Sequence, residues 1–368
     1  MGKHNTPDAA VDEPVRNRPS RTDVRNMALI MAALAVFVVA MIASYSGAFA
    51  KPTLHHLSVA VAAPEQLVDG MRAQDALTVT PVADAAAARA EVYERRVDAA
   101  FAVTSPGHLD VYVAGGGGRS VANAAETVGR AVAAKAGLAA TVTDVAPTTA
   151  EDPQGTVVFY AVIFLSIGAS VGATVFNRMM GSVRHAVTLG WRTLSLAAYS
   201  AVLAGGVTLY VDGVLGALTG HTWQVFGALF LYAIAVAGAV TGVAAAFGTV
   251  ASALLTMFLV IVGNSAAAGP VGKPLLTGFY TTFNGIVPQG SGVSLLRSVE
   301  YFGGHGAATP LVTLLVWAAA GCLLAIVATV IRSGALRSVL NYRASHDGDA
   351  AGRRDGAVLR PRVLSPTD

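Results

Sequence analysis

The stretch from Trp223 to Val262 contains no charged residue. An α-helix rises about 1.5 Å per residue, so about 20 apolar residues cross the ~30 Å hydrocarbon core of a bilayer. The stretch is therefore long enough for two membrane-spanning helices, and its glycines predict a turn between them near residues 242–248. With 54% hydrophobic and only 13% charged residues, the whole chain lies outside the usual range of soluble domains. We expect a mainly α membrane protein.

Apolar runs predict six transmembrane helices. They cover residues 27–50 and about 156–176, 194–211, 223–243, 247–263 and 311–331. The first run ends in Ala48-Phe49-Ala50, a pattern that a signal peptidase can cut, but it exceeds the roughly 7–15 apolar residues of a signal peptide. We interpret it as an uncleaved anchor, and cleavage between Ala50 and Lys51 is the alternative.

Residues 51–154 differ abruptly in composition from the apolar runs and contain twelve acidic and eight basic residues. Alternating β-branched segments predict strands, separated by segments of helical composition and by turns at proline and glycine. The predicted strands are 57–62, 77–82, 97–103, 109–113 and 141–145, and the predicted helices are 64–73, 84–95 and one after residue 120. We expect a small α/β domain inserted between the first two membrane helices, and a five-helix membrane domain over residues 155–331.

A run of four glycines, 115–118, precedes Arg119 and Ser120. It joins a predicted strand to a helix start, where backbone N–H groups can hold an anion. The run lacks the Gly-Lys-Ser/Thr ending of a P-loop, and we expect a flexible connection with Ser120 as N-cap. The pair His55-His56 has no further ligands at metal-site spacing. No bound metal or cofactor is predicted.

The basic residues predict the orientation. Residues 1–26, 178–192 and 332–368 carry five, three and seven Lys or Arg, whereas 212–222 and 263–308 carry none and two. Both termini are therefore expected in the cytoplasm, as disordered tails, and residues 51–154 outside the cell membrane. The net charge of +3 gives no indication of nucleic-acid binding.

Residues 264–306 are rich in glycine and proline yet remain apolar. Irregular backbone at membrane depth is tolerated only where protein or a water-filled cavity surrounds it. We therefore expect a re-entrant outer cap of two short helices that closes a cavity.

The middle of each predicted span lacks ionisable residues, which argues against an ion-coupled transporter. No catalytic constellation is evident, so an enzyme is not expected. Residues 177–190 are amphipathic and predict a short helix along the inner surface, either docking a cytoplasmic partner or binding lipid headgroups. The pairs Gly168/Gly172 and Gly238/Gly242 would permit close helix packing.

This plan resembles the membrane subunits of ABC-2 type exporters, in the branch with a large extracellular insert that includes phage-infection-protein-like membrane proteins. The resemblance covers most of residues 27–331, and Ser265 follows Asn264 where relatives often have proline. The segments that carry it are Val97–Val103 with Leu109–Val113, Phe159-Tyr160, Gly263-Asn264-Ser265, and Ile286–Gly292 leading into Leu296-Arg297 and Tyr301–Gly304.

The resemblance implies a permease that exports a lipidic or amphipathic substrate. It implies a pair of such subunits, as a homodimer or heterodimer, and a separate ATPase, since the chain lacks a P-loop motif. The residues that would contact the ATPase are Arg178, Met179, Arg184 and His185. The resemblance also implies that the outer cap gates the exit, with Gly263, Asn264, Pro270, Pro288, Gly290 and Arg297 as candidate gate residues. A non-transporting membrane scaffold, whose outer domain binds an envelope component, is the alternative.

Overall fold

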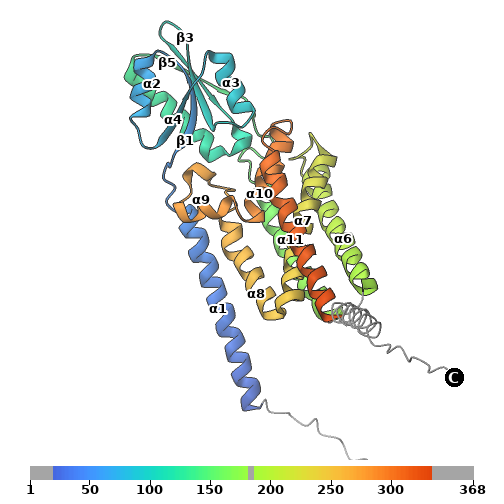
Figure 1. Cartoon of the computed structure of the whole chain (residues 1–368). Helices are drawn as coiled ribbons and strands as arrows, with labels where there is room; N and C mark the ends of the chain where they lie inside the picture. Colours follow the sequence, from blue (N-terminus) through green and yellow to red (C-terminus); the bar gives the residue numbers. More distant parts are fainter. Residues whose placement is uncertain (1–19, 181–185, 334–368) are drawn as a thin grey trace, which may run out of the picture. The chain divides into compact units, whose positions relative to one another are not determined.

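A computed structural model describes residues 20–180 and 186–333 (Figure 1). The chain divides into two compact units, residues 1–43 and 44–368. Helix α1 (Arg21–Phe49) begins in the first unit and ends in the second.

Helix α1 starts six residues before the predicted span, because the preceding residues cap it. The Asp23 N–H donates to Ser20 Oγ at 3.1 Å, and the Ser20 N–H donates to the Asp23 carboxylate at 3.0 Å. This reciprocal pair is a capping box. Residues 21–26 are therefore helical and not part of a disordered tail, whereas residues 1–19 of the predicted tail lie outside the described residues.

The described residues of the second unit include a five-stranded sheet of order β2-β1-β3-β4-β5. Neighbouring strands are parallel except for the hairpin of β3 and β4. All five strands overlap the predicted ones, and the last begins two residues earlier. They are β1 (Leu57–Ala62), β2 (Leu77–Pro81), β3 (Ala99–Ser105), β4 (His108–Val113) and β5 (Ala139–Asp144).

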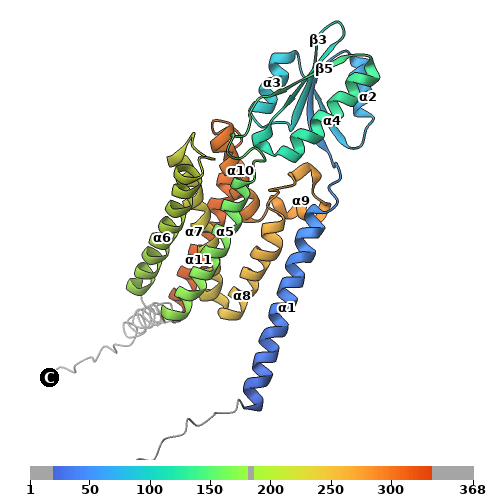
Figure 2. The ribbon, with the colours of Figure 1, turned by 180° about the vertical axis from the view of Figure 1, so that it is seen from behind.

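Three helices cover the two faces of this sheet (Figure 2). Helices α2 (Glu65–Arg72) and α4 (Arg119–Ala136) share a core with the valines of β1, while α3 (Ala85–Tyr93) packs on the alanines of β1 and β3. Side chains alternate between faces along a strand, so one face carries the larger Val, Leu and Phe side chains and the other mainly alanines with Tyr112. We call residues 57–144 the sheet region.

The sheet region presents one particular edge to the rest of the unit. Strands β4 and β5 run opposite to β1–β3, so the starts of β1 and β3 and the ends of β4 and β5 share this edge. The His55 N–H, just before β1, donates to the Pro274 carbonyl at 2.8 Å. The residues around this edge therefore meet the connecting segment, the name we use for residues 264–306.

Within residues 20–180 and 186–333, five helices are long and apolar enough to cross a membrane. The architecture is mainly helical and compatible with a multi-pass membrane protein. The five are α1, α5 (Val157–Met180), α6 (Ala186–Thr208) with its π-helical extension Leu209–Val214, α7 (Thr222–Phe247) and α11 (Ala308–Arg332).

The fifth predicted span, residues 247–263, is shorter than the others. Helix α8 (Thr249–Phe258) continues in a π-helical turn to Gly263, and these residues cover roughly 22 Å at 1.5 Å per residue, less than the ~30 Å core. The turn predicted near residues 242–248 occurs at Gly248, which at φ +90° separates α7 from α8, whereas residues 242–247 still belong to α7.

Both predicted glycine pairs lie at close helix contacts. A Cβ built on Gly242 would lie 2.3 Å from the carbonyl oxygen of Gly321, so α7 and α11 meet backbone to backbone. On α5, Gly172 lies under the ring of Tyr199, whose hydroxyl donates to the Gly168 carbonyl at 2.9 Å. Small residues permit this approach between apolar helices.

The prediction of a separate short amphipathic helix over residues 177–190 is wrong. Residues 177–180 end α5 and residues 186–190 begin α6, eight residues before the predicted span, while residues 181–185 lie outside the described residues. The charge of Arg192 led the prediction to end the inner segment there. Its side chain is instead buried in the second turn of α6.

The connecting segment forms two short helices, as predicted. They are α9 (Gly278–Asn284) and α10 (Pro288–Tyr301), which follow a 3-10 turn at Lys273–Leu275. Pro288 occupies the first turn of α10, where its missing N–H costs no hydrogen bond. Helix α10 packs against both α7 and α11, and it also contacts the sheet region.

A cation-lined cavity as candidate functional site

Arg95 joins the sheet region to α10. It follows α3 with φ at +59°, a left-handed conformation that is uncommon outside glycine. Its guanidinium donates to the Ser294 carbonyl at 2.8 Å and to the Ser298 hydroxyl, and it lies 5.0 Å from the centre of the Phe302 ring. The turn after α3 thus directs a cation at α10.

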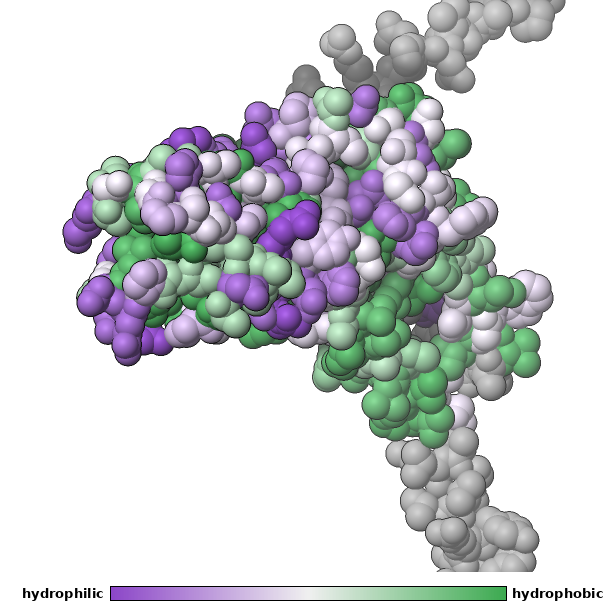
Figure 3. Space-filling view, turned by 90° about the horizontal axis from the view of Figure 1, so that it is seen from above, coloured by the Kyte–Doolittle hydropathy of each residue, from purple (hydrophilic) through white to green (hydrophobic). Residues whose placement is uncertain are grey.

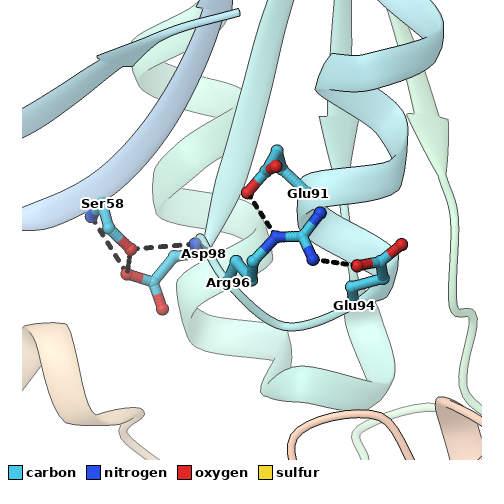
Figure 4. Close-up of polar contacts among 5 residues, drawn as sticks. All are labelled: Ser58, Glu91, Glu94, Arg96 and Asp98. Atoms are coloured by element: carbon cyan, nitrogen blue, oxygen red, sulfur yellow. Dashed lines mark hydrogen bonds and ion pairs between the residues drawn. The ribbon is translucent and has the colours of Figure 1, made fainter.

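The neighbouring charges in this turn have partners within the sheet region (Figure 4). Arg96 donates to Glu91 at 2.8 Å and also to Glu94. The Asp98 carboxylate accepts from the Ser58 N–H at 3.0 Å and from its hydroxyl at 2.6 Å, which ties the start of β3 to β1. Arg95 is therefore the arginine of this turn that reaches beyond the sheet region.

The glycine run is a close contact and not a flexible connection. A Cβ on Gly116 would lie 2.4 Å from Tyr301, and Gly118, at φ +144°, lies against the Arg297 guanidinium. Gly118, and not the predicted Ser120, precedes the first residue of α4. The Ser120 hydroxyl instead accepts from the Gly272 N–H at 3.1 Å, which links α4 to the connecting segment.

Arg297 is the buried cation of α10, with 5% of its surface exposed. It donates to the carbonyls of Ala268 at 3.2 Å and Gly269 at 3.0 Å. Burial lowers the pKa of Arg297 to about 10, and the nearby charge of Arg95 acts in the same direction. Because this pKa is still well above 7, the side chain remains a cation at neutral pH.

These groups surround a cavity of about 180 Å³ between the sheet region and the connecting segment. Adjoining recesses of about 210 Å³ and 690 Å³ share Lys273 with it. Among the described residues, the cations of the cavity wall form no ion pair. The charged residues that line it are Arg95, Lys273, Arg297 and Asp98.

The six predicted gate residues lie in different surroundings. Gly290 and Arg297 line it. Gly263 lies against Gln289, Asn264 is fully buried, and Pro288 begins α10. Pro270 is exposed and lines none of these recesses.

The sequence did not single out Gln289, which lies next to two of the predicted gate residues. Its side chain is fully buried, and its amide donates to the Ser166 hydroxyl at 3.1 Å and to the Leu259 carbonyl at 3.0 Å. Gln289 therefore ties α10 to α5 and to the π-helical turn after α8. An uncharged amide among apolar residues was the available signal.

The four residues predicted to contact an ATPase are only partly described. Arg178 and Met179 lie exposed in the last turn of α5. Arg184 and His185 lie outside the described residues. The described part of the chain thus places two of the four at one helix end.

The comparisons with known proteins identify no relative. No protein-family model matches this chain, and neither a curated protein nor a solved structure matches it. The resemblance to ABC-2 type exporter subunits therefore rests on the residues and their order in the sequence.

Glu300, near the end of α10, is a partly buried carboxylate. One carboxylate oxygen accepts from the Gly220 N–H at 3.1 Å, and burial raises the pKa of Glu300 despite this bond. A raised pKa means that the folded state binds the proton more tightly, so this contribution to stability is present at low pH and lost as pH rises through the folded pKa.

We expect Glu300→Gln to melt about 1–2 °C higher than the unsubstituted protein at pH 8, because the amide still accepts from Gly220 without a buried charge. The difference should shrink at pH 5. Thermal unfolding in one detergent at both pH values measures it. A variant that melts lower than the unsubstituted protein at pH 8 would contradict the assignment.

Proposed function

We propose that this protein is the membrane-spanning permease subunit of an exporter for a lipidic or amphipathic substrate, driven by a separate ATPase. The observation that carries the proposal is the cation-lined cavity, whose adjoining recess reaches the first turns of the apolar helix α11. Such an arrangement offers a polar site to one end of an amphipathic molecule and an apolar surface to the other.

The distribution of surface hydrophobicity supports this division. In residues 51–154, Tyr93 is the exposed large hydrophobic side chain, whereas α1, α5, α6 and α11 carry many and α7 exposes Trp223 and Phe247 at its ends. Figure 3 shows hydrophilic side chains spread over the sheet region and more hydrophobic surface on the helical part beyond it. We infer that the sheet region lies in water, outside the cell membrane, with both termini in the cytoplasm.

The contacts of α10 support a coupling between the sheet region and the membrane helices. Arg95 fastens α10 on one side, and Gln289 fastens it to α5 on the other. Domains packed across an interface can move as rigid bodies when a protein changes state. A displacement of the sheet region would therefore be passed to α10.

Purification of the tagged protein in mild detergent, with the copurifying chains identified by mass spectrometry, tests the proposal. A stoichiometric subunit with a P-loop would support the permease. Recovery of envelope components without any ATPase would overturn it in favour of a membrane scaffold.

Charge reversal locates the ATPase contact. Arg178 is exposed at the end of α5, and a glutamate in its place would repel an acidic partner surface. We therefore expect Arg178→Glu to reduce ATPase recovery at least about fivefold. The matched control is Arg332→Glu, which reverses an exposed arginine in the last turn of α11. Equal loss in both variants would indicate altered membrane topology and contradict a specific contact at Arg178.

A further inference from the structure

We propose that the cavity between the sheet region and α10 binds the anionic headgroup of an amphiphile, a phosphate or carboxylate group. The site comprises Arg95, Lys273 and Arg297, and Asp98 also lines the cavity. The inference rests on the proposed function only in taking the bound molecule as the substrate. Binding itself needs no ATPase.

The charges of the cavity wall are unbalanced. Three cations and one carboxylate line it, which leaves a net charge of +2. The hydrogen-bond partners of Arg297 and Arg95 are carbonyl and hydroxyl oxygens, which bring no negative charge. The carboxylates whose charges act on them, Asp98 on Arg95 and Asp152 on Arg297, form no ion pair with either arginine among the described residues. A buried charge is costly unless an opposite charge compensates it. An anion would supply that compensation.

The guanidinium groups also have N–H donors beyond those used in the hydrogen bonds described above. Each guanidinium carries five N–H donors, and Arg297 uses its two terminal nitrogens on two carbonyls. Arginine is suited to planar, bidentate recognition of carboxylate and phosphate. Lys273, exposed on the wall shared by all three recesses, adds a flexible ammonium at the mouth.

The backbone around the cavity is held in unfavourable conformations. Ala268, whose carbonyl accepts from Arg297, has φ at +57°, and Arg95 has φ at +59°. Such residues cost on the order of 1–3 kcal/mol each and cluster at ligand sites. Two of them on opposite walls of one cavity agree with a binding role.

The dimensions favour a headgroup over a whole lipid. The cavity of about 180 Å³ is smaller than the roughly 300–1,000 Å³ of sites that enclose a drug-sized ligand. The recess of about 690 Å³ shares Lys273 and Asp98 with it and extends along α9. Acyl chains would therefore remain outside the cavity while the charged group enters it.

Calorimetry on the full chain in a neutral detergent tests this inference. The probes are dioctanoyl phosphatidylglycerol, dioctanoyl phosphatidylcholine and inorganic phosphate. We expect phosphatidylglycerol to bind at least about tenfold more tightly than phosphatidylcholine. Significant phosphate binding without a gain from the acyl chains would identify a free anion as the ligand of the same site.

Two substitutions change the charge of the wall in opposite directions. Lys273→Gln should weaken phosphatidylglycerol binding about fivefold, the effect of a partly exposed ion pair of about 1 kcal/mol. Asp98→Asn should strengthen it by a similar factor, since Asn can still accept from Ser58. A gain in affinity cannot arise from misfolding. Lys135→Gln removes an exposed lysine that does not line this cavity and is the control.

Equal binding of the two lipids, or equal affinity of Lys273→Gln and Lys135→Gln, would overturn the inference. That result would leave the permease proposal standing if an ATPase copurifies. Conversely, phosphatidylglycerol binding that depends on Lys273, without any ATPase, would retain the anion site and reject the permease.

Discussion

Gly242→Ala is expected to destabilise the protein strongly. The added methyl group would lie 2.3 Å from the carbonyl oxygen and 2.9 Å from the Cα of Gly321. These are backbone atoms of α11, so no side chain can rotate away and the two helices must separate. Overpacking of this kind costs roughly 1–3 kcal/mol, and more where the backbone must move. Thermal unfolding in detergent, together with the monodisperse fraction in gel filtration, measures the effect.

The same helix offers a matched control. Gly227 lies on α7 and is exposed, and a methyl group added there would have no neighbouring atom within 4 Å. Alanine is favoured over glycine in a helix by about 1 kcal/mol, so Gly227→Ala should be as stable as the unsubstituted protein or more stable. If both variants melted alike, the close contact between α7 and α11 would be disproved.

The sequence predicted those elements whose signals are local. The short, mostly apolar runs at 57–62 and 109–113 reflect burial of both sheet faces, and these strands form at the predicted residues. The spacing of Gly238 and Gly242 likewise predicted a close helix contact. The partner, Gly321, was not predictable, since its run carries no such pair at four-residue spacing.

The errors occurred where tertiary contacts override local pattern. The charge of Arg192 predicted an inner loop that ends there, but this side chain is buried within α6. Four glycines predicted flexibility, whereas Gly116 is required for the approach of Tyr301. Composition cannot distinguish a glycine that bends the chain from one that admits a neighbour.

The candidate site was predicted in part for the same reason. Gly290 and Arg297 belong to an apolar segment in which a charge is conspicuous, and both line the cavity. Arg95 belongs to a charged turn, where it looks like Arg96 beside it. The two arginines differ in a long-range contact, because Arg95 donates to Ser294, which lies 199 residues further along the chain.

Arg95→Ala is the second substitution with a large expected effect. It removes the hydrogen bonds to the Ser294 carbonyl and the Ser298 hydroxyl and the contact with the Phe302 ring. Hydrogen bonds from a charged group contribute about 1.5–3 kcal/mol, so we expect a loss of about 3 kcal/mol. Amide hydrogen exchange of residues 288–301 should rise together with a fall in Tm. Arg89→Ala, which removes an exposed arginine of α3, should change neither.

Arg95→Lys separates fastening from anion binding. Lysine keeps the positive charge on the cavity wall but lacks the planar guanidinium that donates to Ser294 and Ser298 together. We therefore expect phosphatidylglycerol affinity to fall less than in Arg95→Ala, with hydrogen exchange in α10 close to that of Arg95→Ala. Loss of lipid binding in parallel with faster exchange would mean that α10 must be held by the sheet region before the cavity can bind an anion, which is the coupling that an exporter would use.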